Sequence, residues 1–283
     1  PLLLAVATAA QVPSPLSFLG HEVGADYLLC NYTDMVRYFD AVAAAYDGTF
    51  GGWPASRLFR FRLIDRIERS VPRGSRLLDV GSGSGEDAGW LASLGFKVVG
   101  IDPSEGMVEV ARAKAVRTDS AARFERADLQ TFTTDQIFDS VYSDFGAMNC
   151  VPVGKWAEPL SRLVRPGGKV FLVLMGRRPL PEFLRAGPSA WKRRREPEAP
   201  VGEGRSIPVS YPGPGEIEAS LGSAFRVERT ETFGALVPPP GMADWPRRNP
   251  ILFGLLAAME LIVSRRRALC SFSDHFLIEL TRR

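Results

Sequence analysis

A glycine-rich turn followed by an aspartate about twenty residues later is the part of this sequence whose residue types and spacing point to chemistry. Gly81, Gly83 and Gly85 stand between an apolar run and an amphipathic stretch, and Asp102 follows the next apolar run. Glycine lets the backbone turn sharply and lets a ligand approach the main chain closely. An acidic side chain after the second strand can accept hydrogen bonds from both ribose hydroxyls. The pattern predicts a nucleoside site; for the glycines alone, a tight strand-to-helix turn is the structural alternative.

The charges around the turn indicate the kind of nucleoside. The dinucleotide fingerprint requires a further glycine where this chain has Glu86, and Asp87 follows it. Two carboxylates in the first turn of a helix complement the helix dipole themselves and would repel a pyrophosphate placed there. Asp79 adds a negative charge at the end of the preceding strand. The site therefore favours a positively charged nucleoside without phosphates, and S-adenosylmethionine, with its sulfonium and ammonium groups, fits that description.

Strands and helices alternate from about residue 75 to residue 175 and position the turn. Short apolar runs predict parallel strands at Arg76–Val80, Lys97–Ile101, Arg123–Arg126, Phe138–Ser143 and Lys169–Met175. Helical spacing predicts helices at 35–46, 54–70, 86–94, 104–115 with Ser104 as N-cap, 155–164 and 214–221. Strands separated by helices indicate βαβ units and a parallel sheet. Two closing strands, Phe225–Thr232 and Phe276–Leu280, are expected to be antiparallel.

From about Ala41 onward, the motifs resemble those of the class I S-adenosylmethionine-dependent methyltransferases. LLDVGSGSG resembles the first motif and VVGIDPSEGMVEVAR the second, and FDSVYSDFGAMNCV and LVRPGGKVFLVLMG resemble the fourth and fifth strands. AAAYDGTF resembles the N-terminal segment whose tyrosine covers the cofactor. The resemblance implies a doubly wound, mostly parallel, seven-stranded Rossmann-like α/β sheet with an antiparallel last strand. Helical insertions would form a substrate cap.

The same resemblance implies a set of residues that bind S-adenosylmethionine and its product S-adenosylhomocysteine. Asp102 would hold the ribose, Asp128 would meet the adenine amino group, and Asp79 would help to hold the ammonium group. Ser143, Asp144 and Phe145 would lie beside the methionyl part. The complete set is Tyr46, Asp79, Gly81, Ser82, Gly83, Gly85, Asp102, Pro103, Met107, Asp128, Leu129, Ser143, Asp144 and Phe145.

The chain divides into a weakly patterned N-terminal extension, residues 1–34, and a methyltransferase-like domain, residues 35–283. Cap insertions are expected at about 177–212 and 234–270. The apolar run from Ile251 to Val263 is about two-thirds as long as a bilayer span requires, and no segment predicts a transmembrane helix. A buried helix in the cap or core is the favoured interpretation of this run. Weak contact with a membrane surface is the alternative, because arginines flank it on both sides.

Composition bounds the remaining possibilities. Of 283 residues, 45% are hydrophobic and 24% are charged, which is typical of a globular protein and excludes a disordered or fibrous chain. The formal net charge of +3 does not indicate a nucleic-acid binder. Three well separated cysteines leave at least one thiol unpaired, which favours a reducing compartment, predicted to be the cytoplasm. With two histidines in the chain, a His-rich metal site is excluded, and we predict no metal.

These observations predict transfer of a methyl group from S-adenosylmethionine to a small molecule, with an oxygen, nitrogen or carbon acceptor. A protein or RNA methyltransferase and a non-catalytic nucleoside-binding module remain alternatives, and Glu86 disfavours a nicotinamide oxidoreductase. No general base is identified: His275 is interpreted as a turn residue, and a cofactor-side role is favoured for Asp144. The arginine-rich stretch Lys192–Arg195, with Arg177, Arg178 and Arg185, is interpreted as solvated surface rather than an anion site. Oligomeric state is not predicted.

Overall fold

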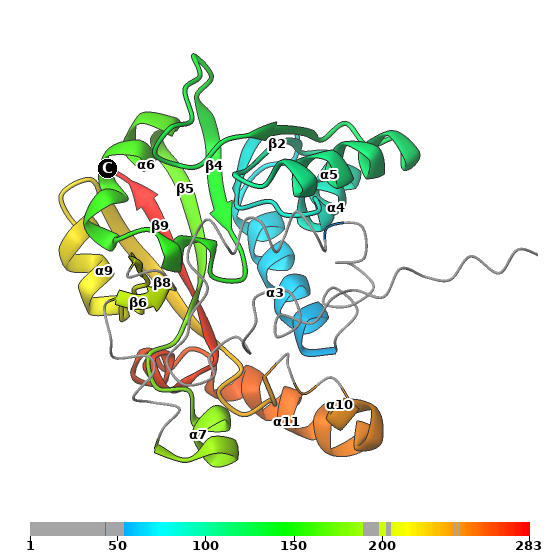
Figure 1. Cartoon of the computed structure of the whole chain (residues 1–283), viewed down its shortest axis with the longest axis vertical. Helices are drawn as coiled ribbons and strands as arrows, with labels where there is room; N and C mark the ends of the chain where they lie inside the picture. The colour runs from blue at the N-terminus through cyan, green and yellow to red at the C-terminus, as the bar shows by residue number, and fades with distance from the viewer. Residues whose placement is uncertain (1–42, 44–53, 189–197, 202–204, 240–241, 243) are drawn as a thin grey trace, which may run out of the picture.

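A seven-stranded mixed sheet forms the centre of the computed structural model, which describes residues 43, 54–188, 198–201, 205–239, 242 and 244–283 (Figure 1). The strand order is β3-β2-β1-β4-β5-β9-β8. The first five strands in this order are parallel, and β9 runs antiparallel to both β5 and β8. The strands are β1 Arg76–Val80, β2 Lys97–Asp102, β3 Arg123–Arg126, β4 Phe138–Ser143, β5 Val164–Met175, β8 Phe225–Phe233 and β9 His275–Arg282. This topology confirms the predicted fold class.

Helices cover both faces of the sheet because successive strand residues point to opposite sides. In β5, Leu172 and Leu174 pack into the core under α6 Ala157–Leu163 and α9 Pro214–Leu221, whereas Phe171 and Val173 face the other core. That second core is built with α3 Pro54–Ser70, α4 Glu86–Ser93 and α5 Glu105–Arg117. Both faces are therefore buried, as a doubly wound sheet requires.

The predicted elements of the sheet begin and end within a few residues of those observed, with one larger difference: the strand predicted at Lys169–Met175 is β5, which already begins at Val164. The helix predicted at 155–164 is α6, and the 3-10 turn η4 Val153–Lys155 precedes it. Pro159 fits the first turn of α6 because its missing N–H has no partner to lose there. The short helix α7 Leu180–Ala186 and the hairpin of β6 Glu198–Val201 with β7 Arg205–Pro208 were not predicted.

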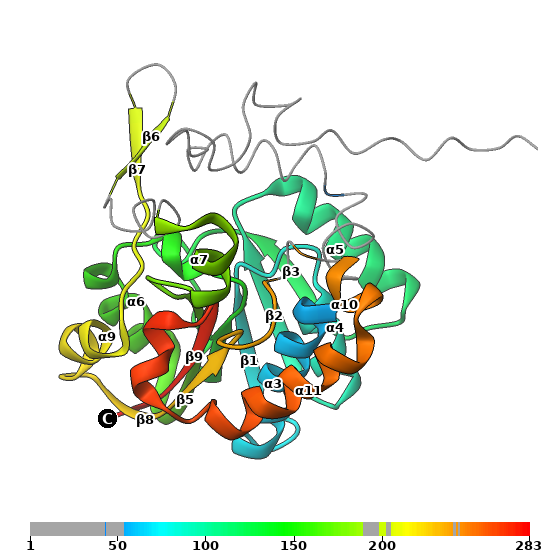
Figure 2. The same ribbon diagram turned by 90° about the horizontal axis from the view of Figure 1, so that it is seen from below.

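The second late insertion lies at the end of the sheet where the parallel strands finish. Met175, the last residue of β5, pairs with His275 at the start of β9, which pairs with Phe233 at the end of β8. The chain that joins β8 to β9 therefore leaves and returns at this end (Figures 1 and 2). It forms α10 Asp244–Arg248, α11 Pro250–Val263 and the 3-10 helix η5 Arg267–Phe272.

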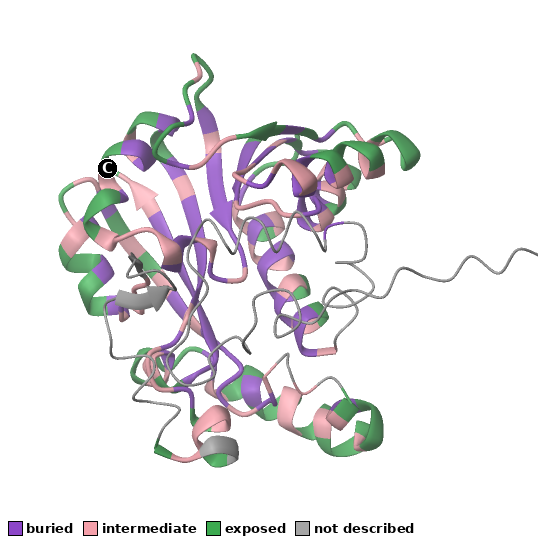
Figure 3. Cartoon of the chain, viewed as in Figure 1, coloured by how far each residue is buried: buried purple, intermediate pink, exposed green. Residues whose placement is uncertain are grey.

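The interpretation of residues 251–263 as a buried helix is wrong. Phe253 and Leu256 pack against the core, but Ile251 is 81% exposed, Leu255 58% and Ile262 80%. The helix lies on the surface with one side against the sheet, and much of its ribbon is coloured as exposed or intermediate (Figure 3). Among the described residues, no helix combines the length and the apolar character that crossing a membrane requires. The N-terminal extension, the helix predicted from Met35 and residues 192–195 lie outside the described residues.

Candidate functional site

The glycine turn after β1 is held against the neighbouring strand by backbone hydrogen bonds. The N–H groups of Gly81 and Ser82 both donate to the carbonyl oxygen of Ile101, at 2.9 and 3.0 Å. Gly83 has a φ of +51°, and a Cβ atom added there would meet nothing within 4 Å. A Cβ on Gly81 would lie 2.3 Å from Ala147 Cβ, and one on Gly85 would lie 2.6 Å from the Phe124 ring. Gly83 therefore leaves open space, whereas Gly81 and Gly85 allow close packing.

Asp102 ties the glycine turn to the loop that starts α5. Its Oδ2 accepts a hydrogen bond from the Gly83 N–H and its Oδ1 accepts one from the Ser104 N–H, both at 2.9 Å. Ser104 in turn caps α5, because its Oγ accepts a hydrogen bond from the Met107 N–H at 3.1 Å. Asp102 therefore fixes the glycine turn and the start of α5 relative to one another.

A cavity of about 240 Å³ opens between these loops and the end of β4. Nine of the predicted cofactor-binding residues line it, namely Gly81, Gly83, Asp102, Pro103, Met107, Asp128, Leu129, Asp144 and Phe145. The sequence analysis missed the other residues of the wall, which are Val80, Ile101, Ser104, Ala127, Gly146, Ala147, Met148, Cys150, Val151 and Met175. Several of these directly follow a predicted strand end, and this position is the signal that could have identified them.

The charged side chains of the cavity wall are all acidic. Asp102, Asp128 and Asp144 line it, and no lysine, arginine or histidine is found among the described lining residues. Asp128 uses one oxygen, Oδ1, to accept hydrogen bonds from the N–H groups of Gln130 and Thr131. The remaining wall is mostly apolar. A ligand with positive charge is therefore complementary to this cavity, and a pyrophosphate is not.

Asp144 is the most deeply buried of the three acids, with 7% of its surface exposed. Its Oδ1 accepts a hydrogen bond from the Phe145 N–H at 2.8 Å, and its Oδ2 has no hydrogen-bond donor in the described structure. Burial and the negative charge of Asp87 raise the pKa of Asp144 to about 8. Arg60 of α3 forms an ion pair with Asp87 at 2.6 Å and lies over the Phe145 ring at 5.4 Å. One arginine thus lies beside two buried carboxylates.

The backbone at the end of β4 is strained next to this acid. Phe145 has a φ of +47°, in the left-handed region that a side chain with a Cβ rarely adopts. Gly146 follows with a φ of +79°. Strained non-glycine residues tend to occur at ligand sites, where the surrounding structure holds them in place. The turn directs Asp144 and Phe145 into the cavity wall.

Four predicted site residues do not line the cavity. Asp79 is buried, and its burial together with the nearby Asp87 raises its pKa well above the usual range. Ser143 is buried and its Oγ donates to the Val80 carbonyl oxygen at 2.7 Å, which joins the ends of β4 and β1. Ser82 and Gly85 belong to the glycine turn and position it. Tyr46 lies outside the described residues.

His275 is not a turn residue, because it is the first residue of β9. Its ring is buried, lies 2.9 Å from Asp274 through Nδ1, and meets the Phe145 ring edge-on at 5.8 Å between centroids. It is not part of the cavity wall. Asn149 also serves the fold: its Oδ1 accepts a hydrogen bond from the Met175 N–H at 3.0 Å, and its Nδ2 donates to the Ser210 carbonyl oxygen at 2.7 Å.

Arg177 does not stand free as a site for an anion. Its guanidinium forms an ion pair with Glu216 at 2.7 Å and donates to the Tyr211 carbonyl oxygen. The described part of the chain contains no cluster of three or more histidine, cysteine, aspartate or glutamate side chains that could hold a metal ion.

The strand order, the glycine turn after β1 and the acid after β2 define a class I S-adenosylmethionine-dependent methyltransferase fold. Residues 77–168 match the family model described as a methyltransferase domain, and the resemblance seen in the motifs is confirmed.

Curated relatives that match part of the chain include two proteins named as methyltransferases. The chain is 33% identical over 144 residues to demethylmenaquinone methyltransferase of Clavibacter sepedonicus, covering 50% of this chain and 58% of that protein. It is 30% identical over 124 residues to ubiquinone biosynthesis O-methyltransferase of Dechloromonas aromatica (strain RCB), covering 41% of this chain and 51% of that one. The matched region thus spans only about half the length of these curated relatives.

Solved structures share the fold over most of the chain. Haemonchus contortus phosphoethanolamine N-methyltransferase 2 in complex with S-adenosyl-L-methionine superposes with a TM-score of 0.58 at 19% identity, over 89% of this chain and 59% of that one. A structure from echinomycin biosynthesis, described as converting a disulfide bond into a thioacetal group, superposes with a TM-score of 0.55 at 22% identity. The match covers 88% of this chain and 92% of that one. At such identities the superpositions show the fold alone.

Proposed function

We propose that this chain transfers a methyl group from S-adenosylmethionine to a small, lipophilic organic molecule. The observation that carries the proposal is the acidic character of the cavity wall, which holds three aspartates, of which Asp144 has its pKa raised to about 8 by burial, and no basic side chain among its described residues. A dinucleotide would bring phosphates against these carboxylates, whereas a sulfonium nucleoside brings complementary charge. The match to the methyltransferase domain supports the same assignment.

The residues of the cavity fit this cofactor in chemistry as well as charge. Asp102 lies in the cavity wall after β2, where a carboxylate can accept hydrogen bonds from ribose hydroxyls, and the open space at Gly83 admits a ligand against the main chain. We assign Asp144, which is buried in the cavity wall at the end of β4, to the cationic methionyl part. Asp128 and Leu129 are assigned to the adenine. When bound, the cofactor supplies a methyl group on positively charged sulfur, an already activated donor.

The protein therefore has to bind, orient and exclude water rather than activate the donor. The buried loop after β4 places Asp144 and Phe145 in fixed positions beside the cavity, which limits motion of the bound cofactor. A general base is needed only if the acceptor loses a proton as it attacks. Among the described residues the cavity wall holds no histidine, so the proposal assigns no base.

A lipophilic acceptor is supported by two observations. The cavity wall beyond the acids is apolar, with Ala147, Met148, Val151 and Met175. The names of the curated relatives describe methylation in menaquinone and ubiquinone biosynthesis. A protein or RNA acceptor is the second candidate, and the labelling experiment below distinguishes it.

Titration calorimetry tests the cofactor. We expect binding of S-adenosylmethionine and S-adenosylhomocysteine and none of NAD. Asp102→Ala is expected to weaken binding by about 1–3 kcal/mol, the loss typical of hydrogen bonds to a charged group. Asp139→Ala is the matched control, because Asp139 is an aspartate at the opposite end of the sheet, where it pairs with Arg165 at 2.7 Å. The affinity of this variant for S-adenosylmethionine should be unchanged. Equal affinity for NAD would refute the assignment.

Activity is tested by incubating the protein with methyl-labelled S-adenosylmethionine and separated metabolite, protein and RNA fractions. Label in an organic-extractable metabolite supports the proposal, and label in protein or RNA supports the second candidate. Cofactor binding without transfer to any fraction would instead indicate a nucleoside-binding module.

A further inference from the structure

Helix α11 differs from an ordinary surface helix because it exposes large apolar side chains and buries its one charged residue. At 3.6 residues per turn, Ile251, Leu255, Met259 and Ile262 share one side, and Glu260 lies on the opposite side. These four apolar side chains are exposed, between 52% and 81%, whereas Glu260 is completely buried. Surface helices normally turn apolar residues inward and charges outward. The outward side is called the α11 face and consists of Ile251, Leu252, Leu255, Met259, Leu261 and Ile262.

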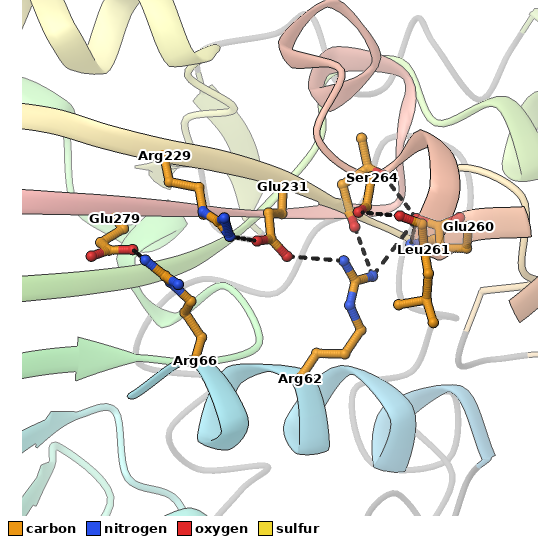
Figure 4. Close-up of polar contacts among 10 residues, drawn as sticks. Arg62, Arg66, Arg229, Glu231, Glu260, Leu261, Ser264 and Glu279 are labelled. Atoms are coloured by element: carbon orange, nitrogen blue, oxygen red, sulfur yellow. Dashed lines mark hydrogen bonds and ion pairs between the residues drawn. The ribbon is translucent and has the colours of Figure 1, made fainter. Parts of the chain in front are cut away.

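Hydrogen bonds fix this orientation, so the helix cannot roll its apolar residues inward (Figure 4). Glu260 Oε1 accepts from Thr232 Oγ1 at 2.9 Å and from the Gly234 N–H at 3.1 Å, and its Oε2 accepts from the Leu236 N–H at 2.7 Å. The Arg62 guanidinium lies 3.9 Å from the same carboxylate. Rolling the helix would leave these buried groups unpaired, which is costly.

Exposed arginines stand at both ends of the α11 face. Arg247 and Arg248 precede the helix, and Arg265, Arg266 and Arg267 follow it. Arg247 pairs with Asp244 and Arg267 pairs with Glu218. Arg248, Arg265 and Arg266 have no ion-pair partner in the described part of the chain, and the one acid within α11 is the buried Glu260.

These charges distinguish between possible occupants of the α11 face. Two copies packed along this helix would bring arginine ends against arginine ends in either direction, and such like-charge contacts are costly. A bilayer surface with anionic headgroups complements both ends, while its acyl boundary accepts the apolar side chains between them. Apolar side chains on one side and flanking basic residues are typical of helices that lie in the plane of a membrane interface.

We propose that α11 docks the protein onto an anionic lipid surface, with the α11 face inserted and the flanking arginines on the headgroups. The helix lies at the end of the sheet where the parallel strands finish and the cavity opens. Docking would therefore place the same end of the molecule toward the bilayer. This inference stands apart from the proposed methyl transfer, because lipid binding needs neither cofactor nor acceptor.

Flotation of the full chain with vesicles tests the proposal. We expect binding to vesicles of phosphatidylcholine mixed with phosphatidylglycerol, weakened at high salt, and much weaker binding to phosphatidylcholine alone. Ile251→Glu with Ile262→Glu should lower the partition coefficient by roughly tenfold or more. Arg265→Gln with Arg266→Gln should lower it by about tenfold on the anionic vesicles only.

Val116→Glu is the matched control, because Val116 is an apolar residue of α5 that is 84% exposed and lies outside the α11 face. It should bind vesicles like the unaltered chain, and all variants should keep their melting temperature because only exposed side chains change. Absence of anionic-vesicle binding, or an equal loss in Val116→Glu, would overturn the proposal. So would a dimer in sedimentation that the double isoleucine variant converts to a monomer. S-adenosylmethionine binding measured on the same samples reports separately on the proposed function.

Discussion

Two regions of the molecule bury carboxylates but surround them with different partners. One is the cavity beside β4, and the other is the α3–α11 junction, where Arg62 of α3 and Glu260 of α11 meet the end of β8. Glu260 at the junction has three hydrogen-bond donors and a guanidinium near it. Asp144 at the cavity has one backbone donor, an Oδ2 with no donor in the described structure, and a neighbouring acid. Burying an ionised carboxylate is costly unless it is paired and hydrogen-bonded.

This difference in hydrogen bonding distinguishes a carboxylate that stabilises the fold from one that could bind a ligand. A satisfied acid such as Glu260 connects elements that are distant in sequence, and adding a ligand would improve nothing there. A buried acid with few hydrogen-bond donors, such as Asp144, has a raised pKa, which a bound cation would lower. Groups with such pKa shifts are often found at functional sites. The same residue property, burial of a carboxylate, thus has opposite meanings in the two regions.

The largest expected effect is on the junction. Glu260→Leu should lower the free energy of unfolding by about 3–5 kcal/mol, because it leaves buried N–H and O–H donors unsatisfied and removes one partner of Arg62. Urea unfolding measures this change. Glu260→Gln keeps one side-chain oxygen that can accept these hydrogen bonds, so its free energy of unfolding should fall by less.

Glu228→Ala is the control for that variant, because Glu228 is an exposed acid paired with Arg226 on the same strand as Thr232. Removing an exposed ion pair should change the free energy of unfolding by less than about 1 kcal/mol. If Glu260→Leu were as mild as this control, the junction would not depend on its buried acid.

The next effect is a pH dependence carried by Asp144. Folded protein keeps the Asp144 proton up to about pH 8, whereas the unfolded chain releases it near the ordinary value of 3.8. The folded state thus binds more protons between about pH 4 and pH 8, so the free energy of unfolding falls as pH rises through this window, by up to about 1 kcal/mol per pH unit. Asp144→Asn should reduce this slope in a series of urea titrations, and the slope that remains belongs to other buried acids with a raised pKa, such as Asp79.

Cofactor affinity should change in the opposite direction. A cationic ligand prefers the ionised carboxylate, so the affinity for S-adenosylmethionine should rise with pH up to about 8 and then level off. In Asp144→Asn the affinity should be weaker and independent of Asp144 titration. A variant that retained the pH dependence of both quantities would place the titrating group elsewhere, for example at Asp79 or Asp87.

The smallest effect on stability is expected at the glycine turn. Gly83→Val should lower the free energy of unfolding by about 1–2 kcal/mol, the cost of a left-handed backbone for a residue with a Cβ. It should nevertheless abolish cofactor binding in calorimetry, because the side chain fills the space left open at Gly83. Gly89→Val, at a glycine in α4 that also has free space around it and no positive φ, should bind normally. Retained binding in Gly83→Val would refute the turn as a ligand site.

The sequence by itself determined the sheet and the position of the cavity. Strands such as β1 and β4 were predicted with their observed ends because apolar runs and glycine turns are local signals. The order of strands and helices then requires right-handed crossovers, which bring the ends of β1, β2 and β4 to one edge. Asp102 and Gly83 meet through a 2.9 Å hydrogen bond for this reason.

Only the tertiary structure decided which residues line the cavity and which support the fold. Gly85 packs against Phe124 of β3, and Ser143 joins β4 to β1, although both had been assigned to the cofactor from their motifs. The inward orientation of Glu260, which contradicts the buried apolar helix predicted there, depends on donors in and after β8. Periodicity along a helix predicts which residues share one side of it. Which side is buried depends on partners distant in sequence, because a buried charge is costly without hydrogen-bond donors.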